Sequence, residues 1–299
     1  MEERRLLGSY KNGDYNVYIW SDGTKIREAP NNVFNPGRPE CIDMGISTKC
    51  NHGCEYCYMG CTMNGQWADF SKYDYLNNMP KLLELNINLN FPLNPDIVPF
   101  LERMKAQHVI VNSTVNQDHF MSHLPLIRNF VDNELIHGLG VSYVTGGKTF
   151  IRKVKEFPNA VVHVIAGYVG KDEIEELADN GIKLLILGYK KLGRGIKYYE
   201  EWDIEHATEC LAEFLPSIQQ RFELIAFDNL ALKQLHVKDW VDPKVWEENY
   251  LGPDAMTSFY IDLVNGYYAP NSLSDDHRPI GNKTVQQMFD DIKGSIKDD

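Results

Sequence analysis

The stretch VVHVIAGYVGKDEIEELADNGIKLLILGYK, residues 161–190, is the part of the sequence that decides the fold. Its two apolar runs, residues 161–168 and 182–189, have the length and composition of buried β-strands. Residues 172–180 between them have a helical pattern, and the acidic pair that opens it suits the first turn of a helix, where the helix dipole favours negative charge. A strand, a helix and a strand in this order predict a βαβ unit, because parallel neighbours need a crossover connection.

The same alternation extends back toward the N-terminus. Four further strand candidates occupy residues 42–47, 83–89, 109–114 and 138–144, and residues 95–105 have a helical pattern. Six strands connected by helices predict an α/β protein with a parallel sheet. Such a sheet can be open or can form part of a barrel.

Short antiparallel strands are expected ahead of this alternation. Residues 15–20 and 24–27 flank an Asp-Gly turn, and an earlier Asn-Gly turn precedes them. Both dipeptides are strong hairpin signals. Residues 30–39 are rich in turn formers and mark a linker. Residues 1–39 are therefore expected to form an N-terminal β-meander.

The rest of the chain divides near residue 200. Residues 40–200 contain the strand and helix alternation, and residues 201–299 are expected to form a C-terminal α+β extension that caps it. Within the extension we predict a strand at 222–227, a hairpin that joins 258–264 to 267–268 through an Asn-Gly turn, and a helix at 284–292.

Composition narrows the class of protein. The 299 residues include 42 acidic and 30 basic ones, and the net charge of -12 opposes binding to nucleic-acid phosphates. No segment has the roughly 20 consecutive apolar residues that a membrane helix needs. The first eight residues lack the apolar core of a signal peptide, so a cytoplasmic protein without a membrane or nucleic-acid partner is expected.

Three of the six cysteines lie within eight residues, in the segment CNHGCEYC. Cys50, Cys54 and Cys57 have the spacing C-x3-C-x2-C and follow the first strand of the alternation. Loops at the carboxyl ends of parallel strands carry the chemistry of α/β proteins, and clustered cysteines in a cytosolic chain indicate metal or redox chemistry. Three thiolates can hold three irons of a cubane and leave the fourth iron open to a substrate or cofactor.

A zinc site is the structural alternative. His52 and Cys61 lie near enough in sequence to complete a four-ligand set with the three cysteines, and a filled coordination sphere is typical of structural zinc. The chain would then be a non-catalytic, zinc-stabilised binding protein.

The cysteine spacing, the aromatic Tyr56 before the third cysteine, and the position after the first βα strand together resemble the radical S-adenosylmethionine (radical SAM) superfamily. The resemblance covers roughly residues 40–200. It implies a partial (βα)6 TIM-like barrel in which Cys50, Cys54 and Cys57 hold a 4Fe-4S cluster. It also implies reductive cleavage of S-adenosylmethionine to a 5′-deoxyadenosyl radical, with electrons from a donor such as flavodoxin or ferredoxin.

The resemblance implies further contacts to the cofactor. Tyr56 is expected against the adenine. Asn88 and Asn90 stand where the family commonly has Gly-Gly-Glu and would receive the methionine ammonium. The other expected cofactor contacts, matched to the ends of later strands, are Thr114, Ser142 and Gly167.

The substrate is left open between two classes. Lys190, Lys191 and Arg194 lie among glycines at the end of the sixth strand and would suit a carboxylate or phosphate, as in a small anionic metabolite or nucleoside, although a solvated basic loop is the plainer alternative. Aromatic residues in the C-terminal extension would suit a peptide. The catalytic residues that act on the substrate are not assigned.

Overall fold

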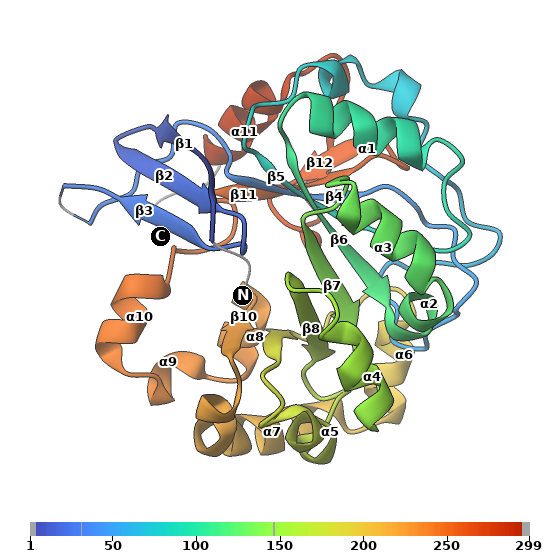
Figure 1. Cartoon of the computed structure of the whole chain (residues 1–299), viewed down its shortest axis with the longest axis vertical. Coiled ribbons are helices and arrows are strands. Elements are labelled where there is room, and N and C mark those ends of the chain that lie inside the picture. The colour runs from blue at the N-terminus through green and yellow to red at the C-terminus, as the bar shows by residue number, and fades with distance from the viewer. Residues whose placement is uncertain (1–3, 31, 146, 295–299) are drawn as a thin grey trace.

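A computed structural model describes residues 4–30, 32–145 and 147–294. It contains a three-stranded sheet and a ten-stranded sheet (Figure 1). The small sheet is the predicted meander, with antiparallel strands β1 (Leu6–Asn12), β2 (Tyr15–Trp20) and β3 (Lys25–Glu28).

The large sheet has the strand order β10-β9-β8-β7-β6-β5-β4-β11-β12-β13. Neighbouring strands from β4 to β10 pair in parallel, which confirms the predicted α/β class. The sheet does not close, because β10 and β13 are its two edges. The parallel strands in chain order are β4 (Cys41–Gly45), β5 (Glu84–Asn88), β6 (Ile110–Asn116), β7 (Gly138–Ser142), β8 (Ala160–Ile165), β9 (Lys183–Leu187) and β10 (Leu224–Phe227).

The C-terminal part of the chain adds strands to both edges of the sheet. The predicted strand at 222–227 is β10, at one edge. The predicted hairpin is β11 (Ser258–Asp262) with β12 (Tyr267–Ala269), followed by the short β13 (Arg278–Pro279). The sequence did not indicate that β11 pairs in parallel with β4, because that pairing joins segments more than 200 residues apart.

Helices cover the outer face of the large sheet (Figure 1). Their bounds are α1 Ile97–Ala106, α2 Gln117–Ser122, α3 Leu124–Asp132, α4 Gly147–Val154, α5 Lys171–Leu177, α6 Gly195–Glu201, α7 Ile204–Ile218, α8 Asn229–Gln234, α9 Val237–Trp240, α10 Pro243–Asn249 and α11 Val285–Lys293, with short 3-10 turns η1 Phe70–Lys72, η2 Asp74–Asn77 and η3 Gln219–Arg221. The three predicted helices correspond to α1, α5 and α11.

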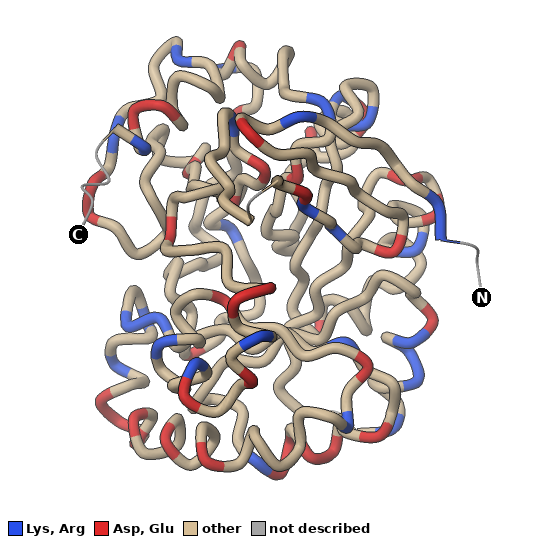
Figure 2. Tube along the Cα trace, turned by 90° about the vertical axis from the view of Figure 1, so that its left-hand side faces the viewer, with Lys and Arg blue, Asp and Glu red and all other residues tan. Residues whose placement is uncertain are grey.

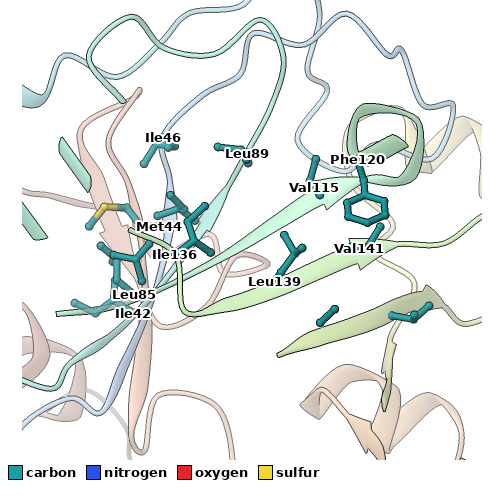
Figure 3. Close-up of a cluster of buried hydrophobic side chains, with 14 of the residues drawn as sticks. Ile42, Met44, Ile46, Leu85, Leu89, Val115, Phe120, Ile136, Leu139 and Val141 are labelled. Carbon is teal, nitrogen blue, oxygen red and sulfur yellow. The ribbon is translucent and has the colours of Figure 1, made fainter. Parts of the chain in front are cut away.

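The parallel strands alternate between two environments. Residues such as Ile42, Leu85 and Val141 are buried and pack against the helices (Figure 3). The residues between them, such as Asp43, Asn86 and Ser142, point to the opposite face and line a cavity. Because side chains alternate along a strand, one face of the sheet builds the core and the other is free to carry polar groups.

The meander closes the amino end of this cavity. Glu40, just before β4, is 1% exposed and forms an ion pair with Arg27 of β3 at 2.7 Å. Lys25 of β3 pairs with both Glu40 and Glu84 of β5. Tyr15 of β2 donates a hydrogen bond to Glu40. These contacts join the small sheet to the start of the large one.

Charged residues of both signs are interspersed along the trace (Figure 2). Within the described ranges, no helix has the length and apolar character needed to cross a membrane.

Candidate functional site

The cavity on the polar face of the large sheet has a volume of about 1050 Å³. This is at the upper end of the volumes that small-molecule sites usually have. Its floor, at the amino ends of the strands, includes Trp20 and Thr24 of the meander. Its walls are the inward-facing residues of β4 to β10. The cysteine loop lies over its other end, where the parallel strands have their carboxyl ends.

Backbone hydrogen bonds fix the cysteine loop on several sides. The Cys50 N–H donates to the Thr62 carbonyl at 2.9 Å, and the Asn51 N–H donates to the Phe91 carbonyl at 2.8 Å. The Arg194 N–H donates to the Cys57 carbonyl at 3.1 Å. The loop is therefore a defined structure, in contact with the segments that follow β5 and β9.

All three predicted ligands, Cys50, Cys54 and Cys57, line the cavity as free thiols. A hydrogen bond from the Cys61 thiol and the field of Arg194 lower the pKa of Cys57 to about 6, although burial opposes this. Burial raises the pKa of Cys54. The lowered pKa of Cys57 favours coordination of a metal, because the thiolate is the form that coordinates.

The two residues that could complete a zinc site both contact the cysteines. The Cys61 thiol is buried and donates to Cys57, and it also lies 3.5 Å from Asn90 Nδ2. The Nδ1 atom of His52 lies 3.2 Å from Cys54 Sγ, and its Nε2 lies 2.8 Å from Asp118. Both residues could act as ligands or as hydrogen-bonding neighbours of ligands.

No group of three or more His, Cys, Asp or Glu side chains in the described chain is arranged to hold one metal ion. Ligands of a single zinc ion must all lie about 2.0–2.3 Å from it. Thiolates of a cubane bind different irons, so they do not have to converge on one point. The described thiols are therefore not preformed around a single zinc ion.

Tyr56 lies at the edge of the cavity and contacts an aromatic residue of the fifth βα turn. Its ring centroid is 3.9 Å from that of Tyr168, with the rings tilted by 46°. Burial raises the pKa of Tyr56, so its hydroxyl is neutral. Tyr168 therefore supports the ring of Tyr56, which is the one of the two that lines the cavity in the described chain.

Asn88 and Asn90 line the cavity, but both already form hydrogen bonds within the protein. The Asn88 amide accepts from the Ile46 N–H at 2.9 Å and donates to the Ser47 carbonyl at 2.8 Å. Asn90 Nδ2 donates to the same Ser47 carbonyl at 3.1 Å. The Asn90 Oδ1 accepts no hydrogen bond from the described residues, so it is the better of the two to receive an ammonium group.

Of the remaining cofactor candidates, two line the cavity and one does not. Thr114 and Ser142 point inward from β6 and β7. Gly167 is not among the described residues that line the cavity; it has φ +76°, and a Cβ there would lie 2.5 Å from Thr208 Oγ1 of α7. A close approach to α7 therefore explains this glycine without a ligand.

The three basic residues after β9 have separate environments. Arg194 donates from Nε to the Cys54 carbonyl at 2.9 Å and from Nη1 to the Cys61 carbonyl at 2.8 Å, so it holds the cysteine loop. Gly193 has φ +55°, and a Cβ there would lie 2.4 Å from the Tyr58 carbonyl, which shows how closely the two loops pack. Lys191 lies over the ring of Tyr199, 4.3 Å from its centroid. Lys190 and Arg194 both line the cavity, whereas Lys191 is not among the described residues that do.

Several cavity residues were not anticipated. His163 faces inward from β8, and burial lowers its pKa to about 4, which keeps it neutral. Asn86 donates to Asp43 at 2.9 Å, and Asn112 donates to Asn86 at 3.1 Å, which forms a chain of polar side chains across β4, β5 and β6. The signal was present in the sequence, because each lies at an alternate position of a predicted strand where an apolar residue is otherwise expected.

Comparisons with known proteins add no relative. No protein-family model matches the chain, and a search of curated proteins returns no match.

Proposed function

We propose that the chain is a radical SAM enzyme, in which Cys50, Cys54 and Cys57 hold a 4Fe-4S cluster at the mouth of the cavity. The observation that carries the proposal is that three thiols on one short, fixed loop line a cavity large enough for S-adenosylmethionine and a substrate. The loop follows β4 and lies where parallel α/β proteins bind their ligands.

The donor set fits such a cluster. Cysteine thiolates are the usual ligands of iron–sulfur clusters, and three of them leave one iron open. Bound there, the cluster would supply the electron that cleaves S-adenosylmethionine to a 5′-deoxyadenosyl radical, which abstracts a hydrogen atom from the substrate.

The protein's own residues would bind and orient S-adenosylmethionine and would exclude water from the site. Arg194 holds the carbonyls of Cys54 and Cys61, so the cysteine loop keeps its shape. Tyr56, held by its contact with Tyr168, would offer a surface for the adenine, and Asn90 Oδ1 would accept from the methionine ammonium. Thr114 and Ser142 offer hydroxyls for the ribose or carboxylate. The meander at the floor would limit the entry of water to the radical.

On this proposal the fold has three parts. The parallel strands of residues 40–200 are the partial (βα)6 TIM-like barrel, residues 1–39 are the meander at its amino end, and residues 201–299 are the extension that completes the pocket. The protein would be cytoplasmic, would take electrons from flavodoxin or ferredoxin, and would act on a small molecule or peptide and not on nucleic acid.

Anaerobic reconstitution with iron and sulfide tests the proposal. Near four irons per chain, the electron paramagnetic resonance of a reduced 4Fe-4S cluster and formation of 5′-deoxyadenosine are expected. Cys54→Ala should lose all three, while Cys210→Ala, on exposed α7, is the matched control and should lose none. Absence of a cluster in the wild type, or undiminished cleavage in Cys54→Ala, would overturn the proposal.

A zinc-stabilised binding protein is the second candidate, because Cys61 contacts Cys57 and His52 contacts Cys54. One zinc per chain and no iron after anaerobic purification would support it. In that case Cys61→Ser or His52→Ala should release the zinc, whereas a three-cysteine cluster should survive Cys61→Ser.

A further inference from the structure

Lys190 is a cation that lines the cavity and uses only part of its hydrogen-bond donor capacity within the described protein. Of its three N–H donors, one goes to Ser272 Oγ at 2.8 Å, and the ring of Tyr58 lies 4.3 Å from Nζ. It forms no ion pair with any residue in the described part of the chain. Burial alone would lower the pKa of Lys190, but Tyr58, Asp228 and Asp43 raise it, so the group is an ammonium. An ammonium with donors left over toward a cavity can bind an acceptor there.

Asp228 presents the complementary group on the same wall. Its Oδ1 accepts from the N–H groups of Gly188 at 2.9 Å and Ala231 at 2.7 Å. Its Oδ2 accepts no hydrogen bond from the described residues, and the residue lines the cavity. Burial raises the pKa of Asp228, although the N–H groups of Ala231 and Gly188 and the nearby Lys190 ammonium oppose the rise.

The charges around Lys190 do not suit a simple anion. Three carboxylates, those of Asp228, Asp43 and Asp254, contribute to its electrostatic environment. A phosphate or nucleotide, with two negative charges and no positive one, would be repelled by these carboxylates. A ligand with one carboxylate and one ammonium meets both signs, since each group finds its opposite.

We propose that Lys190, Ser272 and Asp228 form the substrate-binding wall of the cavity and bind a zwitterion of the α-amino acid class. The substrate carboxylate accepts from Lys190 Nζ and from the Ser272 hydroxyl, and the substrate ammonium donates to Asp228 Oδ2. The side chain then lies in the remainder of the cavity, along the inward residues of β5 to β8. That such a ligand is the substrate of a radical reaction rests on the proposed function; its binding does not.

Binding measurements test this directly. The probes are the twenty common L-α-amino acids, screened by saturation-transfer NMR against the metal-free protein and against the reconstituted protein with S-adenosylmethionine. We expect at least one to bind, with its N-acetyl and carboxamide derivatives at least tenfold weaker by calorimetry. Lys190→Met should weaken binding at least tenfold, and Ser272→Ala should weaken it less. Lys191→Met is the matched control and should not change it, because Lys191 lies over Tyr199.

Three results would overturn the inference. The first is that no amino acid binds in either state, with circular dichroism showing folded protein. The second is that adenosine monophosphate or inorganic phosphate binds and depends on Lys190. The third is that Lys190→Met weakens S-adenosylmethionine as much as the amino acid, since these groups would then hold the methionine end of the cofactor. Iron content and 5′-deoxyadenosine report on the proposed function separately, so either idea can fail without the other.

Discussion

Polar side chains lie at both ends of the parallel strands, but their bonding within the protein differs. At the amino end, Glu40 is saturated by Arg27, Lys25 and Tyr15, so its charge is fully paired inside the protein. At the carboxyl end, the thiols, Asn90 Oδ1 and the Lys190 ammonium keep capacity to bind something else. Paired groups stabilise a fold, whereas buried groups with free capacity mark a binding site.

Of the single changes proposed for the two ends, Glu40→Ala should have the largest effect on stability. It removes the common partner of Arg27 and Lys25 and leaves buried cations less well paired. The free energy of unfolding should fall by about 3 kcal/mol, as expected when one partner of a buried ion pair is lost. Urea denaturation followed by circular dichroism measures it. A loss below about 1 kcal/mol would mean that the amino end does not stabilise the fold in this way.

Arg194→Met should loosen the cysteine loop at the carboxyl ends of the strands and leave the ion pairs of Glu40 at the amino ends intact. The loss of two hydrogen bonds from a charged donor should cost about 1–3 kcal/mol and should loosen the cysteine loop. We expect reconstituted protein to retain less iron on dilution than the wild type. Lys191→Met is the matched control, and equal iron loss in both variants would contradict the role given to Arg194.

The pH dependence of the unfolding free energy should show whether Glu40 stabilises the amino end through its charge. Burial alone would raise the pKa of Glu40, but Arg27 and Lys25 outweigh burial and hold it below its usual value. A lowered folded-state pKa contributes stability that is present above the unfolded pKa, near 4.3–4.5, and is lost as the pH falls through the folded pKa. The difference in unfolding free energy between wild type and Glu40→Gln should therefore be constant near neutrality and shrink below about pH 4.5. A difference independent of pH would show that Glu40 does not act through its charge.

Cys61→Ser should have the smallest effect, if the fourth iron has no protein ligand. The hydroxyl can still donate to Cys57, so stability should change by less than about 1 kcal/mol. Iron content and the electron paramagnetic resonance spectrum should remain those of the wild type. Loss of the metal in this variant would make Cys61 a ligand and would close the open position.

Much of the fold was predictable because it depends on local pattern. The strands at 42–47 and 182–189 and the helix at 172–180 appear within a few residues of their expected places, as β4, β9 and α5. The parallel pairing of β11 with β4 was not predictable, since an isolated apolar run does not say which edge of a sheet it will join. The separation of Lys190 from Arg194 was equally hidden, because both are cations on one short loop and differ only in what folds against them.

The sequence by itself determined the alternation of strands and helices and the crowding of Cys50, Cys54 and Cys57 after the first parallel strand. Both follow from periodicity and spacing, which are properties of neighbouring residues. Only the tertiary structure decided which groups are satisfied by the protein and which face the cavity unpaired. Arg194 and Asn88 line the cavity together with Lys190 and Asp228, but the first two form hydrogen bonds to the chain around the cysteines, while Lys190 and Asp228 keep bonding capacity. The physical reason is that hydrogen-bond satisfaction depends on partners brought from distant parts of the chain.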